Sequence, residues 1–285
     1  MNETLKRSIS GAVYIILLIA SIGYSNTENQ TSFFILFGVF LLITVYEFCI
    51  LLDLNKIFPL ILSIILYFLN YKISTSKSTI DGFYHILHYN KTFDLAILFL
   101  ALIVSVKCFV FLYDDKNVKI DSFSKFAYLI GYIILPFIII TKIPFAKEEY
   151  NPNILISIFI LIWTNDTFAY LVGKSIGKHK LFERISPKKT IEGFIGGIIF
   201  AVIASYFISK YYIKASTIIW IIIALIVGIF GTIGDLVESK FKRIAGVKDS
   251  GKIMPGHGGI LDRLDSVIFV APIVFLFYQI LNYVS

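Results

Sequence analysis

The stretch IIWIIIALIVGIFGTIG, residues 218–234, decides the fold because no charged side chain interrupts it. About 20 apolar residues in a helix cross the hydrocarbon core of a bilayer, with every backbone polar group satisfied inside the segment. Asp235 follows directly, and a polar, glycine-rich stretch begins at Ser239. We therefore expect a transmembrane helix at about 218–236 that leads into a functional segment.

The composition of the whole chain agrees with this stretch. Of its 285 residues, 57% are hydrophobic and only 16% are charged, and the mean hydropathy is +0.82. A soluble domain carries about 25% charged residues, and no single core of this size could hide so much apolar surface. The composition predicts an all-α, polytopic membrane protein. Cys49 and Cys108 lie in apolar runs, so we interpret them as small hydrophobic residues and expect no Cys/His metal site.

About nine transmembrane helices fit the length of the chain. The apolar runs lie at about 9–23, 33–52, 57–71, 95–113, 127–144, 153–172, 193–213, 218–236 and 266–284. Lys6 and Arg7 precede the first run, which is either a signal peptide or a span. We interpret it as an uncleaved span because further spans follow and no small-residue cleavage site is present.

The spans leave no room for a soluble domain of appreciable size. We expect a single membrane domain over residues 1–285, a helical bundle whose N-terminal spans cover residues 1–150. The catalytic spans cover residues 151–285 and carry the two longest cytoplasmic loops, at 173–192 and 237–265.

The distribution of lysine and arginine indicates the orientation. With the N-terminus in the cytoplasm, most of these residues fall in cytoplasmic segments, so we predict an N-in, C-out protein of the cytoplasmic membrane. The net charge of +7 is concentrated in these loops and does not indicate a nucleic-acid partner. The polar segment 72–94, with His85 and His88, is interpreted as a solvated loop on the outside.

The segment Ser239–Asp265, SKFKRIAGVKDSGKIMPGHGGILDRLD, mixes acidic and basic residues at high density. Carboxylates hold Mg²⁺ through oxygen, and basic side chains neutralise phosphate oxygens, so this composition is typical of a site for a metal-bound polyphosphate. The glycines around His257 remove side chains where backbone N–H groups would approach an anion. The residues expected to act here are Asp235, Ser239, Lys242, Arg243, Lys248, Asp249, His257, Asp262, Arg263 and Asp265.

Three acidic residues lie inside predicted spans, where an ionisable side chain costs a few kcal/mol and indicates function. Asp166 and Asp235 each end an apolar helix at the cytoplasmic side and lead into a lysine-rich loop, so we interpret both as site residues. Glu47 lies late in the second span. We interpret it as a structural hydrogen-bonding residue or one that snorkels to the interface.

Helical spacing refines this site. If the helix continues past Asp235, Ser239 lies one turn further on the same face, and Glu238 pairs with Lys242. Asp262 and Asp265 are three residues apart, so a helix that begins near Gly259 turns both carboxylates to one side. Asp235, Asp262 and Asp265 could then surround a metal ion. The alternative for the last two is an ion-pair network with Arg263 and the loop lysines.

The first cytoplasmic loop contains the segment Ser186-Pro187-Lys188-Lys189-Thr190, followed by Glu192 and an apolar helix. Ser186 or Thr190 is a candidate N-cap, which would direct free N–H groups and the helix dipole at an anion. The charge of this loop also fits a patch for anionic lipid headgroups.

Both loops resemble those of phosphatidate cytidylyltransferases, the CDP-diacylglycerol synthases. The resemblance rests on Ser239, Lys242-Arg243, Lys248-Asp249, His257-Gly258-Gly259, Asp262-Arg263 and Asp265, and on the segment S-P-x-K-T-x-E-G that begins at Ser186. It covers roughly residues 155–270, and a match at so many fixed positions is specific.

The resemblance implies that CTP and phosphatidic acid react to CDP-diacylglycerol and pyrophosphate, with Mg²⁺ on Asp235, Asp262 and Asp265. It also implies a homodimer. His257 would be a phosphate donor or a structural turn residue, and the lipid would enter sideways through a cavity above Asp166 and Asp235. The residues expected to bind substrate are Asp166, Lys174, Ser186, Lys188, Lys189, Thr190 and Glu192.

Two other functions fit parts of the sequence. A CTP-dependent kinase of a membrane alcohol would use similar metals, but it would need a base for a neutral hydroxyl. A transporter would use Glu47, Asp166 and Asp235 as an ion path, but these acids cluster at one face and the densest motif lies in a loop, not at the midplane.

Overall fold

The apolar runs form long helices in the structure, a computed structural model that describes residues 3–25, 29–75, 91–114, 119–146 and 150–284. The first helices are α1 (Glu3–Tyr24), α2 (Thr31–Leu51), α3 (Ile57–Thr75) and α5 (Lys91–Phe111). Four joined segments follow: α6 (Ser122–Tyr128), the π-helical η1 (Leu129–Ile134), α7 (Leu135–Lys142) and the 3₁₀ turn η2 (Ile143–Phe145). The remaining elements are α8 (Pro152–Ile176), β1 (Lys180–Phe182), β2 (Ser186–Thr190), α9 (Ile191–Phe207), the π-helical η3 (Ile208–Tyr212), α10 (Thr217–Ile244) and α11 (Leu261–Val284).

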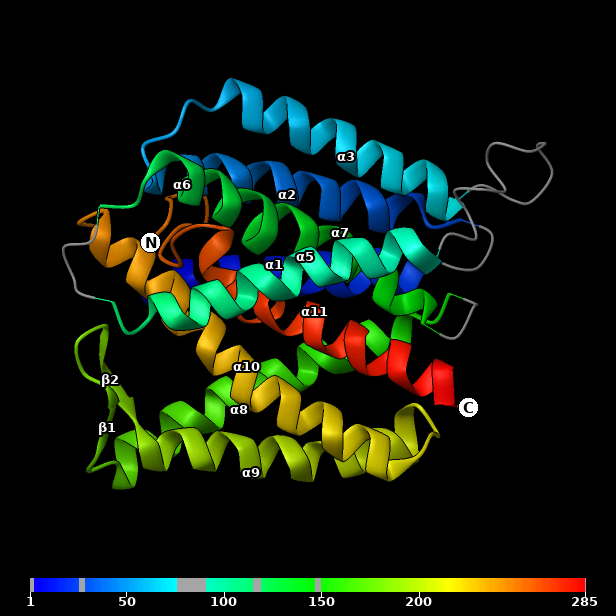
Figure 1. Ribbon diagram of the computed structural model, residues 1–285. Helices are drawn as coiled ribbons and strands as arrows, with labels where there is room; N and C mark the ends of the chain where they lie inside the picture. The colour runs from blue at the N-terminus through cyan, green and yellow to red at the C-terminus, as the bar shows by residue number, and fades with distance from the viewer. Residues whose placement is uncertain (1–2, 26–28, 76–90, 115–118, 147–149, 285) are drawn as a thin grey trace.

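Nine stretches of the described chain are long and apolar enough to cross a membrane, which confirms the predicted all-α, polytopic architecture. They run side by side in one bundle, and the two ends of the chain lie at opposite ends of it (Figure 1). An odd number of spans requires this arrangement of the termini. His85 and His88 lie outside the described residues.

The span Ser122–Phe145 occupies the interior of the bundle. In its most apolar part 83% is buried inside the protein, whereas the corresponding share is 17% in both α1 and α3. The outer helices present large apolar side chains such as Ile16, Phe58 and Phe68 to their surroundings. Such faces suit a hydrocarbon environment, since lipid is as apolar as these side chains.

Helix α10 continues well beyond the membrane span predicted from the sequence. Phe241, near its end, packs against the rings of Phe48, Phe111, Tyr128 and Tyr132, which come from four other parts of the bundle. This burial stabilises the helix where its sequence becomes charged. The expected loop 237–265 is therefore wrong at both ends, because only residues 245–260 separate α10 from α11.

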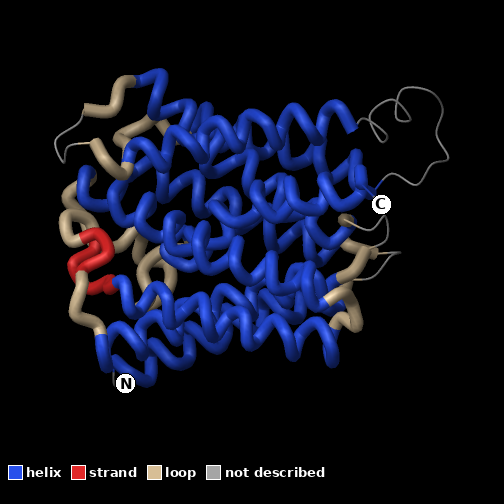
Figure 2. The backbone as a smooth tube through the Cα atoms, turned by 60° about the horizontal axis from the view of Figure 1, so that its bottom comes forward, coloured by secondary structure: helices blue, strands red, loops and turns tan. Residues whose placement is uncertain are grey.

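The other expected loop, 173–192, also contains regular structure. Helix α8 runs to Ile176, and strands β1 and β2 form an antiparallel hairpin beyond it. The hairpin lies at one end of the bundle, away from the C-terminus (Figure 2). The carboxylate of Glu192 accepts hydrogen bonds from the backbone N–H of Lys178 and His179 and contacts the His179 ring, so it fastens the hairpin to the start of α9.

Close helix contacts around α8, α9 and α10 depend on glycine. A Cβ atom at Gly197 would lie 2.7 Å from the backbone oxygen of Asn165, and one at Gly228 would lie 2.6 Å from the Ile198 side chain. Small residues let membrane helices approach closely. These contacts fix α8, and with it Asp166, beside α9 and α10.

Candidate active site

Three carboxylates form an acidic cluster where α10 passes the start of α11. One oxygen atom each from Asp235, Glu238 and Asp265 lies within 4.8 Å of the others. Asp235 and Glu238 are three residues apart on one face of α10, and Asp265 lies in the first turns of α11. Gly234 permits the contact between the helices. Any larger residue there would place a Cβ atom only 2.6 Å from the backbone oxygen of Asp265.

Glu238 belongs to this acidic cluster, whereas Asp262, expected from the sequence to bind the metal, does not. The pair of Glu238 with Lys242, predicted from helical spacing, is confirmed at 2.5 Å. The signal for its second role is its spacing of three residues from Asp235, which puts both carboxylates on one helical face. Metal ligation by Asp262 stays a prediction.

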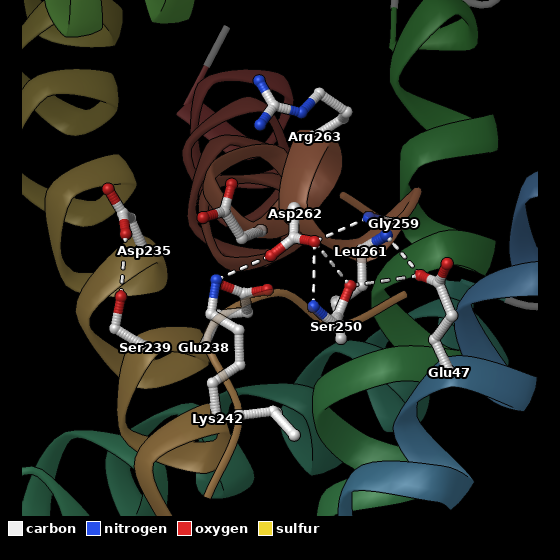
Figure 3. A network of polar contacts seen from close by, with 12 residues as sticks. Glu47, Asp235, Glu238, Ser239, Lys242, Ser250, Gly259, Leu261, Asp262 and Arg263 are labelled. Carbon is white, nitrogen blue, oxygen red and sulfur yellow. Dashed lines mark hydrogen bonds and ion pairs between the residues drawn. The ribbon is translucent and has the colours of Figure 1, made fainter. Parts of the chain in front are cut away.

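Asp262 lies beside the cluster and binds the loop between α10 and α11, residues 245–260. One of its oxygens is 2.6 Å from Lys242 Nζ. The other accepts hydrogen bonds from the N–H of Ser250 at 2.9 Å, from the Ser250 hydroxyl at 2.9 Å and from the N–H of Gly259 at 2.7 Å (Figure 3). Lys242 therefore contacts two carboxylates, one on each helix.

The chemistry of the acidic cluster fits a hard divalent cation. Its donors are all carboxylate oxygens, which Mg²⁺ prefers. Glu238 is buried, and its Oε1 atom has no hydrogen-bond donor among the described residues. An unpaired buried acceptor is costly, and a cation would satisfy it. Asp235 keeps 38% of its side chain exposed, so the cluster is accessible.

The hairpin brings the lysine-rich segment at residues 186–190 to this cluster. Lys189 Nζ on β2 lies 2.7 Å from the Asp235 carboxylate, and the Ser239 hydroxyl donates to the same carboxylate at 3.2 Å. Thr190 is the N-cap of α9, as predicted, and its hydroxyl accepts from the Gly193 N–H at 3.1 Å. The two segments singled out from the sequence therefore meet in space.

His257 lies in a tight turn held against α1. Its Nδ1 atom is 2.8 Å from the Ser10 hydroxyl, which also lies 3.0 Å from the Pro255 carbonyl. Burial lowers the pKa of His257, and the positive charges of Arg263 and Arg7 lower that pKa further. The ring is therefore neutral at pH 7, which suits the structural turn role better than that of a cationic phosphate donor.

The glycines of this turn serve the protein's own contacts. Gly258 has a φ of +84°, in the left-handed region that favours glycine. The N–H of Gly259 donates to Asp262, and the N–H of His257 donates to the Met254 carbonyl at 2.9 Å. The N–H groups of His257 and Gly259 are therefore already used within the protein, and the contact of the glycine segment with an anion stays a prediction.

Sequence reasoning missed the place of Glu47 at this site. Its carboxylate is buried and accepts hydrogen bonds from the N–H of Ile260 at 3.2 Å and of Leu261 at 2.9 Å. The structural hydrogen-bonding interpretation is thus confirmed. No local pattern could show the partners, because they lie more than 200 residues away in the chain.

Comparisons with known proteins give the family of the chain. A model of the cytidylyltransferase family matches residues 5–281. The chain belongs to this family. Phosphatidate cytidylyltransferases resemble it closely: one from Staphylococcus aureus (strain COL) is 54% identical over 118 residues, and one from Staphylococcus haemolyticus is 51% identical over 132. These matches cover 41% and 46% of the chain, and 45% and 50% of the relatives.

The remaining predicted residues lie outside the acidic cluster. Asp166 is exposed on α8 and accepts from the Asn165 amide at 3.2 Å. Arg263 donates to the His257 carbonyl at 3.0 Å. Ser186 lies partly buried on β2. The other charged residues are exposed at this end of the bundle: Lys174, Lys188, Arg243, Lys248 and Asp249.

Proposed function

We propose that the chain is a phosphatidate cytidylyltransferase, which converts CTP and phosphatidate to CDP-diacylglycerol and pyrophosphate. A phosphate oxygen of phosphatidate would attack the α-phosphorus of CTP, and the bond to the β-phosphate would break. Pyrophosphate would leave with the electron pair of that bond. The proposal is supported by the family of the chain and by the names of its relatives.

The observation that carries the proposal is the acidic cluster with lysines on both sides of it. Asp235, Glu238 and Asp265 would hold Mg²⁺, which supplies charge neutralisation at the phosphate oxygens and the leaving group. Lys189 and Lys242 contact these carboxylates at 2.7 Å and 2.5 Å. Both lysines lie close enough to the acidic cluster to contact the oxygens of a polyphosphate bound there.

The reaction needs no strong base at this site. A phosphate monoester is largely dianionic near pH 7. The main barrier is alignment of two anions and their repulsion, which positioned cations reduce. Lys189, Lys242 and Arg263 would neutralise charge, and the Ser239 hydroxyl would donate to a phosphate oxygen. The exposed cations Arg243 and Lys248 would attract CTP.

The membrane placement follows from the same proposal. The N-terminus, the hairpin and the loop at residues 245–260 between α10 and α11, called the motif loop, lie at one end of the bundle (Figures 1 and 2). We infer that this end faces the cytoplasm, where CTP is found, and that phosphatidate reaches Asp166 and Asp235 from the inner leaflet. The homodimer stays a prediction.

A product assay tests the proposal. Purified protein in detergent receives labelled CTP, phosphatidate and Mg²⁺, and we expect CDP-lipid and pyrophosphate, with neither formed when EDTA is present. Release of CDP with phosphorylation of a lipid alcohol would replace the proposal with the kinase. Ion flux in proteoliposomes without CTP turnover would replace it with the transporter.

A further inference from the structure

Glu47 connects the N-terminal half of the bundle to the start of α11. Its two carboxylate oxygens accept from the N–H groups of Ile260 and Leu261, and its exposed fraction is only 1%. The first N–H groups of a helix have no partner within the helix. A carboxylate there satisfies them and interacts favourably with the helix dipole. Glu47 thus takes the place of an N-cap for α11, although it belongs to α2.

Ser250 joins Glu47 to the carboxylates of the site. Its hydroxyl lies 3.3 Å from the Glu47 carboxylate and 2.9 Å from that of Asp262. Asp262 in turn contacts Lys242, which contacts Glu238 of the acidic cluster. Figure 3 shows this continuous chain of polar contacts from α2 across the loop to α10.

The loop is shaped around the Glu47 side chain. A Cβ atom added at Gly251 or Gly259 would overlap with its carboxylate, so the backbone packs directly on the charged group. Removal of one acceptor oxygen would leave a buried N–H or hydroxyl without a partner. The first turn of α11, which carries Asp262 and Asp265, would then lose its fixed position relative to α10.

We propose that Glu47 is a positioning residue for divalent-cation binding at Asp235, Glu238 and Asp265. It does not touch the cation. It holds the N-terminus of α11 so that Asp265 faces the two carboxylates of α10. Its effect on turnover rests on the proposed function, whereas its effect on cation binding does not.

The test compares Glu47→Gln with two other variants of the full chain in detergent. Ser250→Ala removes only the hydroxyl between the two carboxylates. Asp53→Asn is the matched control, because it makes the same carboxylate-to-amide change at an exposed position just after α2, where φ is +51° and asparagine is tolerated. Mn²⁺ binding is followed by electron paramagnetic resonance, unfolding by a thermal melt, and turnover with CTP and phosphatidate over a range of Mg²⁺ concentrations.

We expect Glu47→Gln to raise the Mn²⁺ dissociation constant by about 10- to 100-fold, the usual effect of a residue that orients metal ligands. The Mg²⁺ concentration for half-maximal turnover should rise in parallel, while the KM for phosphatidate stays at the wild-type value. Ser250→Ala should shift both cation measurements in the same direction by a smaller factor. Asp53→Asn should match the wild type.

A lower unfolding temperature with wild-type Mn²⁺ affinity and kcat would overturn the inference and leave Glu47 a purely structural residue. If Glu47→Gln does not fold, Ser250→Ala decides, and unchanged Mn²⁺ binding in that variant overturns the inference. If the wild type binds Mn²⁺ but makes no CDP-lipid, the proposed function fails, and the comparison of Mn²⁺ affinities still decides the role of Glu47.

Discussion

Single side chains set the charge balance of the candidate site. Glu238 adds a buried carboxylate to Asp235 and Asp265, and Lys242 is the cation that contacts both Glu238 and Asp262. Several carboxylates at such short distances repel one another, and this repulsion is reduced by a lysine or a metal ion. The identity of each ligand is therefore testable one residue at a time.

The first prediction separates Glu238 from Asp262. Glu238→Gln removes a member of the acidic cluster, so we expect the Mg²⁺ concentration for half-maximal activity to rise by at least about 100-fold, beyond the usual effect of an orienting residue. Asp262→Asn should raise this concentration by a smaller factor and should also lower kcat, because it disturbs Lys242 and the loop without removing a member of the acidic cluster. Mg²⁺ titrations of both variants check this, and equal titrations would contradict the assignment.

The second prediction concerns His257 and pH. The pKa of this residue is lowered in the folded protein, so the neutral ring contributes stability that is present above about pH 6.5 and is lost as the pH falls. The groups that face it are Arg7 and Ser10 of α1 and Arg263 of α11. We expect His257→Asn to reduce the fall in unfolding temperature between pH 7 and pH 5 by about 1–2 °C. An unchanged fall would show that His257 does not titrate in this range.

Pairs of helices determine how closely the carboxylates approach. Gly234 lies where α10 contacts α11, and an added Cβ would lie 2.7 Å from that of Phe269. Gly231 lies one turn earlier. A Cβ atom added there would lie 3.6 Å from the Cβ atom of Ser266, which is an ordinary van der Waals distance. The two glycines therefore form a matched pair on one helical face.

The third prediction uses this pair. Gly234→Ala should destabilise the protein by about 1–3 kcal/mol through overpacking and should lower activity strongly, because it separates Asp235 from Asp265. Gly231→Ala should be stable and active, since alanine favours a helix more than glycine does. Thermal melts and the product assay compare them, and equal behaviour would contradict the close contact at Gly234.

The fourth prediction contrasts two buried lysines on α10. Lys240 donates to the carbonyls of Phe111 and Asp114, so it holds the end of α5, whereas Lys242 contacts the site carboxylates. Lys240→Met should lower stability by about 1–3 kcal/mol and leave the Mg²⁺ dependence of turnover unchanged. Lys242→Met should abolish activity. A shifted Mg²⁺ dependence in Lys240→Met would link α5 to the site.

The two chain ends lie at opposite ends of the bundle, and the candidate site lies at the end that holds the N-terminus (Figure 1). Cys49 and Cys108 are fully buried, so the native thiols are shielded from labels. Lys252 is exposed in the motif loop, and Tyr283 exposes 92% of its surface near the other end. These positions allow a direct measurement of orientation.

The fifth prediction is that a membrane-impermeant maleimide labels Tyr283→Cys in intact cells. Lys252→Cys should react only after the membrane is permeabilised, because the motif loop is proposed to face the cytoplasm. The opposite pattern would reverse the orientation, and labelling of both in intact cells would contradict an odd number of spans.

The division of the chain at residue 150 stays a prediction at this scale. Residues 151–285 supply the acidic cluster and both lysine-rich segments, but described residues of the other half contact the motif loop. Among them are Arg7, Ser10 and Glu47. The N-terminal spans therefore support the site as well as crossing the membrane.

The sequence by itself determined the apolar helices and the family resemblance, because apolar runs and motif spacing are local properties of the chain. It also predicted two members of the acidic cluster, Asp235 and Asp265. Helical periodicity also predicted the Glu238–Lys242 pair, and it placed Ser239 on the face of Asp235, where the structure shows a hydrogen bond between the two side chains. The tertiary structure alone decided which carboxylates meet, because Asp265 reaches Glu238 only through the contact of two helices. It also decided the role of Glu47, since a buried carboxylate takes its function from whichever N–H groups the fold brings to it.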